Sequence, residues 1–367
     1  WNALSFVLFG VNLLAPRILL LLSFTGFLAG AYAIARRFAG PRTSAAVVLC
    51  MSVWGMPNYP AALPTWYNIF LSIGTLWGLA RYLESSQKRW LVVAGAWAGV
   101  SMLMKLTGLY TLAGALFAVG FFEQAAARVN TGAEGRASPG LRWYSLVLTG
   151  ASGVFVLMVV RLVASDLTGT SFVHFVLPTS IVAGLMVYLE WSRPSAVPSG
   201  ERLRRALGMV APLVAGALAP LLLFAAFYAA AGGLDELIQG VFVSPLKRLT
   251  EATLLPPSLG QALPSLGLIA VLVLGAATRG IVRKTLLAVG ATLLAATLIA
   301  GGNPAIFQDV WSGNVIAIPL CVAAGVAVLK FTMTGVRPIQ TAGTLSPDLQ
   351  PVLVAALLAQ LAVLGLL

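Results

Sequence analysis

The sequence has few charged residues and almost no histidine or cysteine. Only 9% of its 367 residues are charged and 59% are hydrophobic, whereas a soluble domain carries about 25% charged residues. The single histidine, His174, excludes a His-rich metal site, and Cys50 and Cys321 both lie inside apolar segments, so we expect no disulfide framework. P-loop, serine-hydrolase, zinc and N-glycosylation motifs are all missing. The composition therefore favours the membrane class.

A formal net charge of +12 raises the question of nucleic-acid binding. The basic residues, however, sit in short loops between apolar runs. This placement excludes nucleic acid as a partner and makes the lipid bilayer the expected one.

Long apolar runs are what the sequence does contain. A helix that crosses a bilayer needs about 20 apolar residues. We expect an all-α polytopic membrane protein with a single transmembrane domain over 1–367 and about twelve spans: 16–35, 43–57, 64–83, 90–104, 106–122, 143–164, 172–191, 207–231, 263–278, 284–301, 314–331 and 351–367. Residues 1–13 are too short to span and are predicted to form a partial or interfacial helix.

The loops between these spans alternate in charge. Eighteen of the 23 basic residues fall in alternate loops, the first of which holds Arg36, Arg37 and Arg42. Because cytoplasmic loops carry excess Lys and Arg, these loops are predicted to be cytoplasmic. Those at 123–142 and 192–206 resemble plain linkers. The longest outer loop, 232–262, is predicted to contain a short amphipathic helix.

Five basic residues map to the outer face or to the outer end of a span: Arg17, Lys105, Arg161, Lys247 and Arg248. Lys105 separates two apolar runs. A continuous helix over 91–122 would be about 48 Å long, against a hydrocarbon core of about 30 Å. The chain is therefore predicted to turn at 105–108, at the outer surface. Lys105 either anchors this helix end in the interface or binds a ligand.

Acidic residues also map to the outer face, and the sequence favours solvated loop positions for them: Asp166, Asp235, Glu236, Glu251 and Asp309.

Three stretches resemble a known family. The first is APRILLLLSFTGFLAGAYAIARRFAGPRTSAAVVL (15–49), and the second is FLSIGTLWGLARYLESSQKRWLVVAGAWAGVSMLMKLTGLY (70–110). The third and weaker is GGNPAIFQDVWSGNVIAIPLCVAAG (301–325). They resemble the GT-C superfamily of integral-membrane glycosyltransferases, and most closely the family-39-like enzymes that use a polyprenyl-phosphate sugar.

This resemblance implies a GT-C-like fold and a chemistry. An acceptor hydroxyl attacks the sugar of a polyprenyl-phosphate-linked donor at the outer face, and the lipid phosphate leaves. Cations stabilise that phosphate, in some members with a divalent metal. Lys105 matches the lysine that ends the family's Gly-spaced helix and Arg17 matches the arginine of the first helix, while Arg161 is a further candidate from its position. A bacterial cytoplasmic membrane is the expected location.

The family's catalytic Asp would lie upstream of Trp1, so we expect further residues to precede this sequence. A non-catalytic subunit of a larger membrane complex, which keeps the fold and packs against other membrane subunits, remains an alternative. A transporter is disfavoured because mid-membrane ionisable groups are almost absent.

Overall fold

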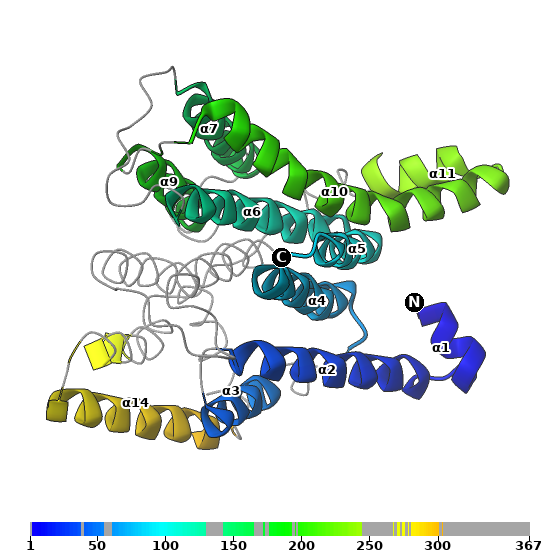
Figure 1. Ribbon diagram of the computed structural model, residues 1–367. Helices are drawn as coiled ribbons and strands as arrows, with labels where there is room; N and C mark the ends of the chain where they lie inside the picture. Colours follow the sequence, from blue (N-terminus) through cyan, green and yellow to red (C-terminus); the bar gives the residue numbers. More distant parts are fainter. Residues whose placement is uncertain are drawn as a thin grey trace. The chain divides into compact units, whose positions relative to one another are not determined.

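The computed structural model describes residues 2–37, 40–54, 61–129, 142–164, 176–192, 197–243 and 280–300, with a few isolated residues between these ranges. All regular elements in these ranges are helical (Figure 1). They are α1 (Asn2–Phe9), α2 (Leu14–Ala35), α3 (Pro41–Trp54), α4 (Pro64–Ser85), α5 (Arg89–Met104), the 3₁₀ turn η2 (Leu106–Gly108), α6 (Leu109–Val129), α7 (Trp143–Val163), α9 (Leu177–Ser192), α10 (Ser199–Ala230), α11 (Leu234–Ile238), the π-helical η5 (Gln239–Val243) and α14 (Gly280–Ala300).

Four helical segments in the described ranges are long and apolar enough to cross a membrane. They are 14–35, 106–124, 143–161 and 199–230. Over the described ranges this confirms the expected all-helical membrane protein. The total of about twelve spans remains a prediction, because the predicted spans 314–331 and 351–367 and most of 263–278 lie outside the described residues.

The chain divides into two compact units. The first contains α1, α2, α4, α5, η2, the part of α10 from Met209 onward, α11 and η5. The second contains α3, α6 from Ala113 onward, α7, α9, the start of α10 up to Gly208, and α14.

In the first unit, α4 and α5 pack side by side (Figure 1). Pro64 lies at the first turn of α4, where its missing N–H costs nothing. Ser86 ends the helix in the left-handed conformation (φ 55°), and its N–H donates to the carbonyl of Tyr82. A Cβ on Gly78 would lie 2.9 Å from the Cβ of Ala94, so the two helices approach closely through small residues.

The other face of α5 packs against α10 through a G-x-x-x-G pattern. A Cβ on Gly95 would lie 1.9 Å from the carbonyl oxygen of Leu213, and a Cβ on Gly99 would lie 2.2 Å from that of Ala217. Small residues spaced by four lie on one face of a helix and let a neighbouring backbone approach. Helix α5, the Gly-spaced helix of the sequence, therefore packs closely against α10 through these two glycines.

In the second unit, α7 packs against α9 and α3 contacts α14. Helix α10 begins at Ser199, eight residues before the predicted span 207–231. The reading of 192–206 as a plain linker was therefore wrong for its second half. Likewise, the linker at 123–142 begins later than expected, because α6 continues to Val129. The length of an apolar run therefore underestimates the length of a helix whose end carries charged residues held in ion pairs.

Two shorter helical segments coincide with predicted interfacial ones. Helix α1 exposes Phe6, Val7 and Leu8, and α11 exposes Leu234 and Ile238. That these segments lie along a membrane surface stays a prediction.

Candidate functional site

Lys105 lies at the predicted turn between two helices. Helix α5 ends at Met104, η2 follows, and α6 begins at Leu109. Lys105 itself has extended backbone (φ −159°, ψ 141°). Its N–H donates to the carbonyl of Ser101 at 3.2 Å, and its carbonyl accepts from the N–H of Gly108 at 2.8 Å. The turn that helix length required is therefore confirmed, and it is closed by backbone hydrogen bonds on both sides.

A buried polar cluster lies beneath this turn. The hydroxyl of Ser101 donates to Oδ1 of Asn68 at 3.2 Å, and Nδ2 of Asn68 donates to Oγ1 of Thr107 at 3.1 Å. Asn68 and Ser101 are both 0% exposed. Gly108 has no room for a side chain, because a Cβ there would lie 2.4 Å from the carbonyl carbon of Ser101. Helix α4 is thus tied to residues before and after Lys105.

The ammonium of Lys105 is exposed and has one weak neutral partner. Its Nζ lies 3.4 Å from Oγ1 of Thr65 on α4. Within the described part of the chain it makes no ion pair. Ion pairs there include those of Arg81 with Glu84, of Arg202 with Glu123 and Glu190, and of Arg205 with Glu201. Lys105 therefore retains hydrogen-bonding capacity for an anion.

The other two predicted cations are exposed as well. Arg17 lies in the first turns of α2 in the first unit, and Arg161 lies in the last turn of α7 in the second. Neither makes an ion pair with a described residue. The role of Arg17 and Arg161 in binding the donor phosphate stays a prediction. Lys247, Arg248 and the acids Asp166, Glu251 and Asp309 lie outside the described residues.

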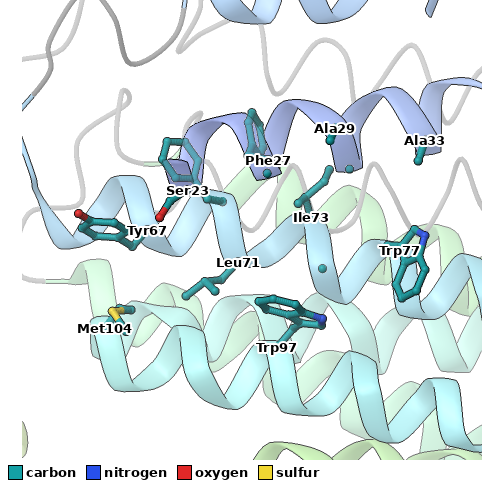
Figure 2. A pocket seen from close by; sticks show the side chains of 14 residues that line it. Ser23, Phe27, Ala29, Ala33, Tyr67, Leu71, Ile73, Trp77, Trp97 and Met104 are labelled. Atoms are coloured by element: carbon teal, nitrogen blue, oxygen red, sulfur yellow. The ribbon is translucent and has the colours of Figure 1, made fainter. Parts of the chain in front are cut away.

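An apolar cavity of about 510 Å³ lies between α2, α4 and α5. Tyr67 and Met104 line it at one end, and Trp77 and Ala33 lie at the other (Figure 2). Trp97 of α5 lies between these ends. Since Met104 directly precedes Lys105, the cavity extends along the helices from the turn that carries the ammonium. Tyr67 is 4% exposed and lines this cavity.

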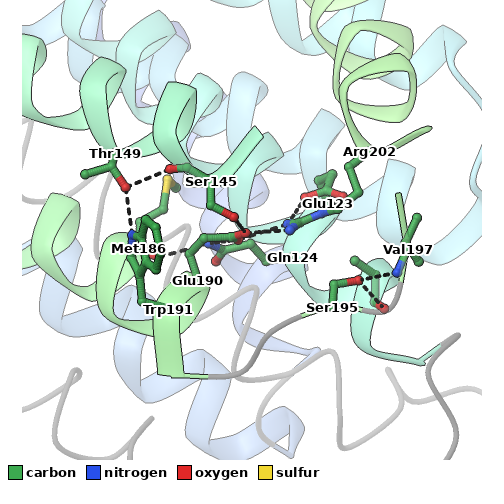
Figure 3. Close-up of polar contacts among 11 residues, drawn as sticks. Glu123, Gln124, Ser145, Thr149, Met186, Glu190, Trp191, Ser195, Val197 and Arg202 are labelled. Carbon is green, nitrogen blue, oxygen red and sulfur yellow. Dashed lines mark hydrogen bonds and ion pairs between the residues drawn. The ribbon is translucent and has the colours of Figure 1, made fainter. Parts of the chain in front are cut away.

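A second polar cluster lies in the second unit and was not predicted. The guanidinium of Arg202 binds the carboxylates of Glu123 and Glu190 (Figure 3). Its Nε and Nη2 donate to Glu123 at 2.9 and 2.7 Å. Its Nη1 and Nη2 donate to Glu190 at 2.5 and 2.9 Å. Side-chain exposure is 6% for Arg202, 0% for Glu123 and 3% for Glu190. Arg202 falls within the predicted linker 192–206, but it is a buried residue with two partners.

Neighbouring side chains complete this cluster. Ser145 donates to Glu190 at 2.6 Å and Gln124 donates to it at 3.1 Å. The ring of Tyr144 lies 4.4 Å from the guanidinium of Arg202. The residues come from the ends of α6 and α9 and the starts of α7 and α10, so these four helix ends lie at one side of the unit. The charge alternation predicts this side to be cytoplasmic.

The second cluster does not fit a catalytic or metal site. No group of three His, Cys, Asp or Glu in the described residues could hold a metal. The two buried carboxylates are occupied by an Arg that lies between them, which leaves no position for a divalent cation. Its chemistry is that of a structural ion-pair network. The sequence signal was present as two isolated acids, Glu123 and Glu190, at the ends of apolar runs.

These observations define the class first: an integral membrane protein, helical in all the ranges the structure describes, whose α5–α6 turn presents a lysine beside an apolar cavity, with no ion pair to a described residue. Residues 2–131 match the family model described as dolichyl-phosphate-mannose-protein mannosyltransferase. The resemblance predicted from the sequence is confirmed over this segment, which includes Arg17 and Lys105 and ends before Arg161. Neither the curated proteins nor the solved structures compared with the chain give a match.

Proposed function

We propose that this protein transfers a sugar from a polyprenyl-phosphate donor at the outer membrane face, and that Lys105 binds the phosphate of the donor. The single observation that carries the proposal is the placement of Lys105. It is an exposed cation without a carboxylate partner among the described residues, and it follows Met104, which lines an apolar cavity. A polyprenyl phosphate combines an anionic head with a long apolar chain, and these neighbouring features suit its two parts.

The chemical role of Lys105 follows from its charge. When the acceptor hydroxyl attacks the sugar, the bond from the anomeric carbon to the phosphate oxygen breaks, and negative charge builds on the leaving phosphate. An ammonium placed there stabilises this charge as it develops. Arg17, inside the same matched segment, is proposed as a second cation for the donor, and Arg161 as a third.

Four of the described acids, Glu84, Glu123, Glu190 and Glu201, are held by Arg side chains. The other two, Asp235 and Glu236, lie in the first turn of α11. The proposal assigns the proton transfer from the acceptor to none of these six acids; the resemblance implies an Asp for this role.

The test is sugar transfer by the full-length protein from a polyprenyl-phosphate donor, with Lys105→Met and Lys105→Arg. A hydrogen bond to a charged group is worth about 1.5–3 kcal/mol, so Lys105→Met should lower kcat/KM about 10- to 150-fold. Lys105→Arg keeps the charge with a different geometry and should lose less. Wild-type transfer by Lys105→Met would assign the lysine to anchoring. Absence of transfer by the wild type with a range of donors would favour a non-catalytic subunit.

A further inference from the structure

Asn68 joins α4 to both sides of the turn that carries Lys105. Its side-chain oxygen accepts from Ser101, four residues before the lysine, and its side-chain nitrogen donates to Thr107, two residues after it. One buried amide therefore spans the point at which α5 stops and the next helix begins. Thr65 lies one turn earlier on α4, and its hydroxyl accepts from the ammonium itself. Residues three apart lie on one helix face, so the same face of α4 contacts the side chain of Lys105 and braces its backbone.

A buried amide is an unfavourable choice for helix packing alone. Asn has low helix propensity, and its burial costs free energy unless its hydrogen bonds are made. Packing of α4 on α5 is already achieved by Gly78 against Ala94, and Thr75 donates to the carbonyl of Ala94 at 3.1 Å in the middle of the helices. An apolar residue at position 68 would serve that packing as well.

The backbone at Lys105 explains what the amide adds. Lys105 has extended backbone between two helices, so the direction of its side chain depends on the conformation of the turn. The hydrogen bonds of Asn68 fix the residues on both sides of Lys105, and thereby limit where its ammonium can point. We propose that Asn68 is a positioning residue, which holds Lys105 in the orientation that binds the donor phosphate. This inference rests on the proposed function of Lys105.

The experiment measures the Kd of the full-length protein for undecaprenyl phosphate, which needs no catalytic turnover. The variants are Asn68→Ala and Thr107→Val, which remove the amide and one of its partners. Thr75→Val is the matched control, because it removes a hydrogen bond between α4 and α5, the helices that Asn68 and Ser101 also join, but away from the turn. We expect Asn68→Ala and Thr107→Val to raise Kd about 3- to 10-fold, and Thr75→Val to leave it within about twofold. Melting temperatures should fall for the control as they do for Thr107→Val.

The decisive arm repeats Asn68→Ala and Thr107→Val in a Lys105→Met background. If Asn68 acts through the lysine, these changes should alter Kd less than about twofold there, because the group they position is gone. An unchanged loss in that background, or wild-type Kd for both single variants, would overturn the inference and leave the role of Lys105 intact. Wild-type Kd for Lys105→Met would instead overturn the proposed function. If Asn68→Ala fails to fold, Thr107→Val against Thr75→Val decides the question.

Discussion

Replacement of Arg202 by Met tests the buried ion-pair network of the second unit. The substitution keeps an unbranched stem of similar length and removes the charge. Four hydrogen bonds from the guanidinium would be lost, two to Glu123 and two to Glu190. Both carboxylates would stay buried, with Ser145 and Gln124 as remaining donors to Glu190.

The expected loss of stability is large. Removal of one partner from a buried ion pair typically costs about 3–5 kcal/mol, because the remaining charge is uncompensated. Arg81→Met provides the control. Arg81 pairs with Glu84 at 2.7 Å within one helix, and their side chains are 41% and 26% exposed. An exposed pair of this kind is worth about 0–1 kcal/mol.

The assay is unfolding in mixed detergent micelles with increasing SDS, followed by tryptophan fluorescence. Arg202→Met should shift the midpoint to much lower SDS than Arg81→Met does. Adding Glu123→Gln and Glu190→Gln to Arg202→Met should recover a substantial part of the loss, since the buried charges are then removed together. Equal midpoints for Arg202→Met and Arg81→Met would refute the reasoning that this network holds four helix ends together.

Two further predictions concern packing and topology. Gly95→Leu should destabilise the first unit, because even a Cβ at this position would lie 1.9 Å from the backbone of α10. Gly153→Leu is the control and should be tolerated, since nothing lies within 4 Å of a Cβ there. Equal midpoints for the two variants in the same unfolding assay would contradict the close packing of α5 on α10. In a background without Cys50 and Cys321, single cysteines at 130 and 198 should react with a membrane-impermeant reagent only from the cytoplasm, and one at 258 only from outside. Labelling of all three from one side would refute the orientation.

Helix positions in the described ranges could be predicted from the sequence, because they depend on the length and composition of contiguous segments. Apolar length predicted α2 and α7 to within two residues, and the limit that bilayer thickness sets on helix length predicted the turn at Lys105. Errors arose where polar groups extend a helix beyond its apolar run. Helix α4 continues past the predicted end at residue 83 to Ser85, with Arg81 and Glu84 paired across its last turn.

The polar clusters could not be predicted, because they join residues that are distant in the sequence. Arg202 lies 79 residues from Glu123, and Asn68 lies 33 and 39 residues from its two partners. Each of these side chains is an isolated polar residue in or beside an apolar run. Such a residue indicates that a partner exists, but only the packing of helices identifies it. The cavity likewise depends on the spacing between α2, α4 and α5, which no local sequence pattern predicts.

Binding of undecaprenyl phosphate tests the central claim most directly. The Kd of the full-length protein is compared for the wild type, Lys105→Met and Lys88→Met. Lys88 is an exposed lysine at the opposite end of α5, so the two variants make the same chemical change at the two ends of one helix. Lys105→Met should raise Kd about 10- to 150-fold, and Lys88→Met should leave it within about twofold. Equal Kd values for the two variants would contradict a phosphate site at Lys105.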